Sequence, residues 1–82
     1  MYFTYILKSK VKDRFYIGNC SDLEERMKKH NNGNSISTKA YILWEIVYVE
    51  EYSMKSEAMK REYALKRIKN KTVLEKIINK II

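Results

Sequence analysis

The sequence predicts one small α/β domain in the order strand, strand, helix, strand, helix, helix. Three observations support this prediction. Two stretches rich in aromatic and β-branched residues, 2–7 and 14–17, are separated by a polar, turn-like segment. Apolar side chains alternate over residues 44–52, and a 3.6-residue apolar period begins after Ser53. With 82 residues, the chain has room for a single domain over residues 1–82.

Composition excludes several classes of protein and site. The longest apolar run is five residues, Ala40 to Trp44, whereas a membrane span needs roughly 20. The N-terminus has no secretion signal, so we expect a cytoplasmic protein. A single cysteine, Cys20, cannot form an internal disulfide, and with one histidine it cannot complete a closed zinc site. The only glycines, Gly18 and Gly33, exclude a P-loop or dinucleotide fingerprint.

The net charge of +7 is concentrated in the C-terminal third. Residues 53–82 carry nine Lys or Arg against three Asp or Glu, while residues 1–52 carry eight against seven. This asymmetry favours a polyanionic partner, because lysines near phosphates release condensed counterions. The alternative is a solvated, lysine-rich surface without a ligand.

The first two strands should form an antiparallel pair, because the polar segment at residues 8–13 is short. The second strand covers residues 14–17 and is expected to end at Gly18. Tyr16 faces the opposite side from its two neighbours in that strand. The pairing would bring Tyr5 and Tyr16 onto neighbouring strands.

A capping box predicts the first helix. Ser21 and Glu24 have the spacing in which a hydroxyl and a carboxylate each satisfy a free backbone donor. The helix should run from about Asp22 to His30. Arg26 and His30 are four residues apart and would project side by side from one flank.

Residues 31–35 form a loop by composition, and polar side chains suited to phosphate contacts follow it. Among them, Thr38 and Lys39 are candidate DNA contacts, and the alternative is an ordinary polar loop.

The remaining elements are one strand and two helices. Residues 44–52 are apolar enough on both sides to be a central strand. Ser53 is a plausible N-cap for a helix to about Ile68. Thr72 and Glu75 form a second capping box, which begins the last helix.

Several side chains suit phosphodiester hydrolysis, which needs a base, a cation at the phosphate and stabilisation of the leaving oxygen. Tyr16 could act as the base, because the positive charge of Arg26 would favour an ionised phenol. Glu62 borders the apolar stripe of its helix and could bind a hard cation such as Mg²⁺. A thiol nucleophile formed by Cys20 with His30 is disfavoured, because Cys20 reads as a small residue just ahead of a helix.

Each candidate also has an ordinary structural explanation. Tyr16 could simply stabilise the sheet, and Arg26 could pair with an acid one turn earlier. His30 could be a solvated residue in the last turn of its helix. Glu62 could form an i,i+4 ion pair with Lys66.

Together, these residues resemble the GIY-YIG endonuclease superfamily. The pattern is Tyr5, ten intervening residues, Tyr16-Ile17-Gly18, then Arg26 and His30 on a capped helix, and Glu62 on a later helix. The sequence is most similar to small stand-alone bacterial members, which are related to the N-terminal nuclease domain of the excision-repair incision enzyme. Several spaced motifs in one order are far more specific than any one of them.

The resemblance implies a three-stranded antiparallel sheet flanked by three helices and a single divalent metal, Mg²⁺ or Mn²⁺. By this analogy, Tyr16 is the general base and Tyr5 assists it. Arg26 and His30 contact the scissile phosphate, and Glu62 binds the metal.

The sequence departs from the family pattern at some positions. Its first triad is Phe3-Thr4-Tyr5, and Asn19 stands where some relatives have lysine or threonine. A late asparagine of many members corresponds to Asn70 or Asn79.

We therefore expect a metal-dependent endonuclease that hydrolyses DNA with little sequence specificity, since no recognition domain is attached. One alternative is a nucleic-acid-binding module of the same fold without turnover. Another is a protein-interaction domain that uses the basic helices. The nuclease prediction requires the five site residues to converge on one concave surface.

Overall fold

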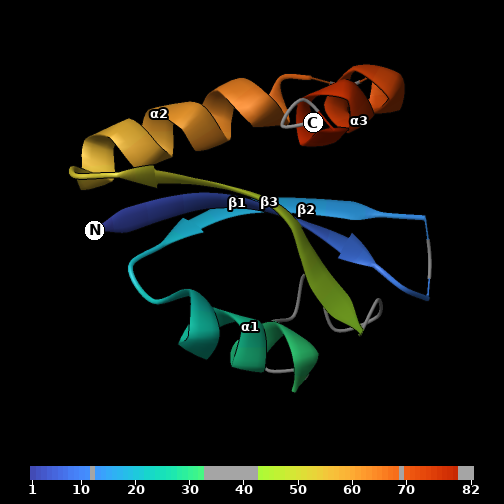
Figure 1. Cartoon of the computed structure of the whole chain (residues 1–82), viewed down its shortest axis with the longest axis horizontal. Helices are drawn as coiled ribbons and strands as arrows, with labels where there is room; N and C mark the ends of the chain where they lie inside the picture. The colour runs from blue at the N-terminus through green and yellow to red at the C-terminus, as the bar shows by residue number, and fades with distance from the viewer. Residues whose placement is uncertain (12, 33–42, 69, 80–82) are drawn as a thin grey trace.

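The computed structural model describes residues 1–11, 13–32, 43–68 and 70–79. Its elements are β1 (Tyr2–Ser9), β2 (Phe15–Cys20), α1 (Leu23–Asn31), β3 (Trp44–Tyr52), α2 (Lys55–Lys66) and α3 (Lys71–Ile78). The predicted order of strands and helices is confirmed (Figure 1).

The three strands form one antiparallel sheet in the order β2-β1-β3. The predicted pairing of the first two strands is confirmed, with Leu7 opposite Tyr16 and Tyr5 opposite Gly18. Tyr5 and Tyr16 therefore lie on neighbouring strands and on the same face of the sheet.

The prediction that residues 44–52 form the central strand is wrong. These residues form β3, which lies at one edge, and β1 is central. Residues 4–7 of β1 are all buried, as expected of a strand covered on both faces. In β3, by contrast, Ile46 and Val49 are 40% and 41% exposed. The apolar side chains of β3 thus belong to an edge strand that is only partly covered by its neighbours.

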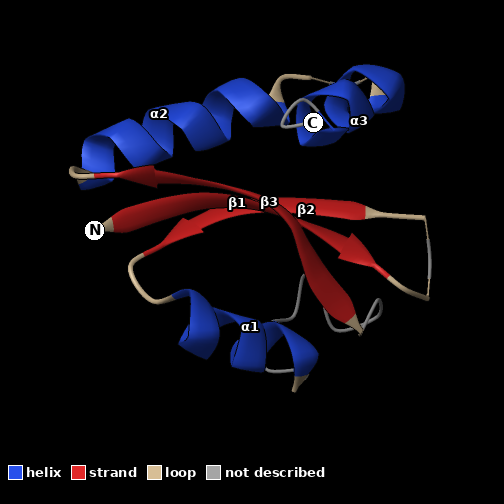
Figure 2. Ribbon diagram, viewed as in Figure 1, coloured by secondary structure: helices blue, strands red, loops and turns tan. Residues whose placement is uncertain are grey.

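Helices cover both faces of the sheet. Figure 2 shows α1 on one face and α2 with α3 on the other. Because successive strand residues point to opposite faces, each face has its own core. The buried residues of the α1 face are Tyr5, Leu7, Cys20 and Trp44. Those of the opposite face are Ile6, Leu65 and Leu74.

The capping box predicted Ser21 as the N-cap of α1, but the N-cap is Asp22. Asp22 has an extended backbone, and its side chain accepts a hydrogen bond from the Glu25 amide at 3.1 Å. Asp22 and Glu25 have the same spacing as Ser21 and Glu24, so the motif alone could not distinguish the two starts.

The predicted caps of the last two helices are also wrong. The N-cap of α2 is Met54, which makes no side-chain capping bond, and Ser53 instead contacts the Glu57 carboxylate at 3.4 Å. The N-cap of α3 is Asn70, which accepts from the Thr72 amide at 2.9 Å. Asparagine is a strong N-cap residue, so the cap lies two residues before Thr72 and α3 begins at Lys71.

Candidate active site

Three of the predicted site residues form a compact cluster beneath α1. The Tyr5 hydroxyl is hydrogen-bonded to Nε2 of His30 at 3.2 Å. The ring centroids of Tyr16 and His30 are 4.9 Å apart, and those of Tyr5 and Tyr16 are 6.4 Å apart. The structure therefore brings two phenols and an imidazole together from two strands and a helix.

Gly18 makes this cluster possible. It was predicted to end the second strand, but β2 continues to Cys20. A Cβ atom at Gly18 would lie 2.6 Å from the Tyr5 hydroxyl oxygen and 3.2 Å from a ring carbon of Tyr16. Glycine is required within the strand because the Tyr5 phenol lies directly against its backbone.

Tyr5 and His30 are each 1% exposed, and burial governs their ionisation. Burial is the main cause that raises the pKa of Tyr5 far above its ordinary value. Burial, and then the charge of Arg26, lowers the pKa of His30. Both groups are therefore neutral near pH 7. The alternative of a solvated His30 is wrong.

Tyr16 and Arg26 form the solvent-facing part of the site. Tyr16 is half-buried, and Arg26 is exposed on α1. Arg26 makes no ion pair with any residue that the structure describes. The alternative of an ion pair with Asp22, one turn earlier at the N-cap of α1, is therefore wrong. The charge of Arg26 nevertheless lowers the pKa of both Tyr5 and His30, which places it near them.

Two shallow pockets of about 160 Å³ each meet at Arg26. Both are lined by Cys20, Ser21 and Arg26. One extends toward Lys29 on α1 and the other toward Lys55 on α2. The first pocket is also lined by Asp22 and Glu25, so the guanidinium is accessible among charges of both signs. Its paired donors can bind a phosphate there.

Glu62 reaches the site from the other helical layer. It lies on α2, which covers the face opposite α1 (Figure 1). Its Oε1 accepts a hydrogen bond from the side-chain amide of Asn19 on β2, which lies at the edge of the sheet opposite β3. Its Oε2 forms an ion pair with Lys66 at 2.6 Å. The expectation that all five site residues share one concave surface is therefore wrong for Glu62, which approaches β2 from the opposite face of the sheet. Tyr5, Tyr16, Arg26 and His30 lie on the α1 face, with Tyr5 and His30 buried beneath the surface.

Electrostatic effects connect Glu62 with the phenol cluster. The Glu62 charge is among the smaller causes that raise the pKa of Tyr5. The hydrogen bond to Glu62 is the main cause that raises the pKa of Lys66, and Tyr16 adds to it. Lys66 thus lies within electrostatic range of both Glu62 and Tyr16.

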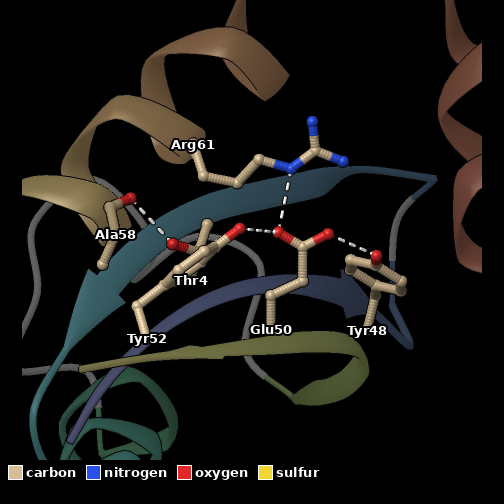
Figure 3. A network of polar contacts seen from close by, with 6 residues as sticks. All are labelled: Thr4, Tyr48, Glu50, Tyr52, Ala58 and Arg61. Atoms are coloured by element: carbon tan, nitrogen blue, oxygen red, sulfur yellow. Dashed lines mark hydrogen bonds and ion pairs between the residues drawn. The ribbon is translucent and has the colours of Figure 1, made fainter. Parts of the chain in front are cut away.

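A network on the far side of the sheet fixes α2, and with it Glu62 (Figure 3). The Thr4 hydroxyl donates to the Ala58 carbonyl oxygen at 2.7 Å. The Glu50 carboxylate accepts from three donors, namely Tyr48 Oη (2.5 Å), Tyr52 Oη (2.5 Å) and Arg61 Nε (2.9 Å). Burial by itself would raise the pKa of Glu50, but these hydrogen bonds outweigh burial and lower it. Burial, and then the hydrogen bond to Glu50, raises the pKa of Tyr52 to about 12.

Sequence reasoning missed two positioning residues. Asn19 was noted only as a departure from the family pattern, yet its amide holds Glu62. Asn31 was placed in a loop, yet it is the last residue of α1 and binds both backbone groups of Trp44. Its Oδ1 accepts from the Trp44 amide at 2.7 Å, and its Nδ2 donates to the Trp44 carbonyl at 3.2 Å. Asparagine is typical of loops, so nothing in the sequence indicated this clamp.

The predicted DNA contacts cannot be placed, and the candidate late asparagines lie at the ends of α3. Thr38 and Lys39 lie outside the described residues. Asn70 and Asn79, the candidate late asparagines, are the N-cap and the C-cap of α3.

Glu62 is the side chain available for a metal at this site. In the described part of the chain, no three His, Cys, Asp or Glu side chains gather as a metal cluster. One carboxylate fits Mg²⁺ or Mn²⁺ only where water and substrate oxygens supply the remaining ligands, as they commonly do for Mg²⁺. Oε2 of Glu62 is paired with Lys66, so a metal that binds this oxygen would compete with the ammonium group.

Comparisons with known proteins identify the family of this chain. The model of the GIY-YIG catalytic domain matches residues 1–77. The chain belongs to the GIY-YIG family. GIY-YIG proteins form a nuclease superfamily that acts on DNA, so the family assignment supports DNA as the partner.

The chain is also similar to small bacterial proteins of the UPF0213 group. It is 41% identical over 75 residues to UPF0213 protein SSP2268 of Staphylococcus saprophyticus, covering 89% of this chain and 92% of that protein. It is 37% identical to UPF0213 protein YazA of Bacillus subtilis, covering 85% and 71%. The solution structure of UPF0213 protein BH0048 from Bacillus halodurans superimposes with a TM-score of 0.59 at 28% identity, covering 96% of this chain and 84% of that one. No described helix is both long and apolar enough to traverse a bilayer.

Proposed function

We propose that this GIY-YIG domain is a divalent-metal-dependent endonuclease that hydrolyses DNA phosphodiester bonds with little sequence specificity. One observation supports this proposal most strongly. Tyr16 is half-exposed and its ring packs against His30 of the neutral, buried Tyr5–His30 pair, while Arg26 is exposed on the helix that carries His30.

Tyr16 is the best candidate for the general base. Tyr5 is buried and its raised pKa keeps it protonated, so it cannot take a proton near neutral pH. Tyr16 is the phenol of the cluster that a water molecule can reach. In the proposed reaction, its hydroxyl oxygen in the ionised form accepts a proton from the attacking water, and the resulting hydroxide displaces the leaving oxygen at phosphorus.

Arg26 would bind the non-bridging oxygens of the scissile phosphate, because its planar guanidinium offers paired donors and is exposed. We assign His30 a positioning role in place of direct phosphate contact. Its ring is buried, neutral and bonded to Tyr5, and its edge packs against Tyr16. His30 would therefore fix the positions of both phenol rings, through its hydrogen bond to Tyr5 and its ring contact with Tyr16.

Glu62, positioned by Asn19, would hold the metal together with water and DNA oxygens. The metal would neutralise charge on the phosphate and stabilise the leaving oxygen. Low sequence specificity is proposed because phosphate contacts by cationic side chains carry no sequence information directly.

A plasmid nicking assay with Mg²⁺ or Mn²⁺ tests the proposal. Tyr16→Phe removes the base and should slow nicking by about 100- to 10,000-fold, as expected for loss of general base catalysis. Glu62→Ala should abolish metal-dependent nicking. Tyr63→Phe is the matched control, because Tyr63 is 55% exposed and its hydroxyl makes no hydrogen bond to a described residue of the site.

Full nicking by Tyr16→Phe would contradict the assigned base. Salt-sensitive DNA binding without cleavage by the wild-type protein would instead support a binding module, for which the basic C-terminal third is the favouring feature.

A further inference from the structure

The Glu62 carboxylate has two very different partners. On Oε1 it accepts from the amide of Asn19, which belongs to a strand of the sheet. On Oε2 it carries the ammonium group of Lys66 at 2.6 Å. The Glu62 side chain is 12% exposed, and that of Lys66 is 49% exposed. One partner is therefore fixed by the sheet, and the other lies half in solvent on a flexible four-carbon chain.

A second carboxylate on this face of the sheet, that of Glu50 on β3, provides a contrast. Glu50 accepts from three donors on β3 and α2, and its arginine partner is bound through Nε at 2.9 Å. No cation can reach Glu50 without breaking several of these bonds. On Glu62, loss of the single Lys66 contact uncovers a whole carboxylate oxygen, while Asn19 keeps the side chain in place.

We propose that Lys66 occupies the cation position on Glu62 and leaves it when DNA binds, which couples metal binding to DNA binding. This inference rests on the proposed nuclease function and adds a residue to it. A DNA phosphate would offer the half-exposed ammonium group an alternative anion. Its departure would leave Oε2 free to hold a divalent cation together with water and phosphate oxygens. Lys66 is thus a positioning residue that disfavours metal binding in the absence of substrate.

Mn²⁺ binding to the DNA-free protein tests this inference without any activity measurement. Free Mn²⁺ is counted by electron paramagnetic resonance for the wild type and for Lys66→Met, with Lys66→Gln as a second variant. Removal of the competing ammonium should tighten Mn²⁺ binding about two- to fivefold, the range expected for a partly exposed ion pair. Lys60→Met is the matched control, because it removes the same charge from the exposed side of the same helix. Glu62→Gln should abolish the tighter binding.

Equal Mn²⁺ affinity of both Lys66 variants and of Lys60→Met would overturn the inference. If the wild type nicks DNA with Mn²⁺ in that case, the proposed function stands and only the role of Lys66 fails. If no variant binds Mn²⁺ and the wild type does not nick DNA, the metal-dependent function fails and the coupling fails with it.

The salt dependence of DNA binding tests separately whether Lys66 contacts a DNA phosphate. In the Tyr16→Phe background, metal-free DNA affinity is measured by fluorescence anisotropy over a salt series. Adding Lys66→Met should reduce the slope of log affinity against log salt by about one, as expected for the loss of one phosphate contact. An unchanged slope would show that Lys66 does not move to DNA and would overturn the coupling.

Discussion

The two faces of the sheet differ in how fully their polar groups are satisfied. On the face covered by α2 and α3, an aliphatic core lies beside Glu50, whose carboxylate accepts from three donors. On the face covered by α1, the core combines aromatic rings with Leu7 and Cys20, and Arg26 is exposed. The first face therefore acts as a scaffold, and the second keeps groups available for a ligand.

The difference also shows in how the helices are attached. α2 is anchored by the Thr4 hydroxyl and by the Arg61–Glu50 pair, whereas α1 is clamped at its end by Asn31 on the Trp44 backbone. Substitutions in the core and the Glu50 network of the scaffold face should thus change stability. Substitutions in the α1-face cluster, and of Glu62 on α2, should change activity. The following predictions test this division, from the largest expected effect to the smallest.

Leu65→Ala should destabilise the domain by about 2 to 5 kcal/mol, because Leu65 is fully buried in the scaffold core. Urea unfolding measures the loss. Val73→Ala is the control, since Val73 is 41% exposed and should cost little. The nicking rate per folded molecule should stay near that of the wild type. A large loss of rate in folded protein would show that the two faces are not separable.

Gly18→Ala should cost about 1 to 3 kcal/mol, as overpacking does, and should also slow nicking. The new Cβ would push the Tyr5 hydroxyl away from His30. Tyr5→Phe removes the atom that lies closest to this Cβ. The double variant should therefore cost less than the sum of the two single ones in urea unfolding. Strict additivity would contradict the proposed contact.

Glu50→Gln should cost about 1 to 3 kcal/mol at pH 7, because it weakens hydrogen bonds to a charged acceptor. The pKa of Glu50 is lowered in the folded protein, so its stabilisation is present above its ordinary value of 4.5 and is lost as the pH falls through the folded pKa. The difference between wild type and variant should shrink below about pH 4.5. A constant difference down to pH 3 would argue against this linkage.

His30 gives the smallest effect, at a higher pH. Its pKa is lowered in the folded protein, so the unfolded chain takes up a proton first as the pH falls below 6.5. Stability should drop by up to about 1 kcal/mol between pH 7 and 5.5. His30→Gln should remove this part of the pH dependence and leave the Glu50 transition in place. An unchanged profile in this variant would assign the transition to another group.

Local patterns in the sequence were sufficient for part of the site. Tyr16 lies on the predicted face of β2, since side chains alternate in any strand. The antiparallel return of β2 then places Tyr16 near Tyr5. The same patterns failed at helix starts, where Ser21 and Asp22 both fit a capping motif.

Residues 44–52 show why strand position could not be predicted. Their apolar side chains suit a strand covered on both faces, yet β1 is the central strand and has the fully buried segment at residues 4–7. Strand order depends on which neighbours pair in space. An alternating pattern carries no information about that choice.

By itself, the sequence determined the order of the elements, the pairing of the first two strands and the residues that point to a nuclease, because periodicity and motif spacing are local properties. The tertiary structure alone decided that His30 is buried against Tyr5 and that Glu62 approaches from the opposite helical layer. It also decided that Lys66 holds the carboxylate oxygen that a metal would need. These contacts join residues on different elements, and only packing of the helices against the sheet establishes which charges meet and how far water can reach them.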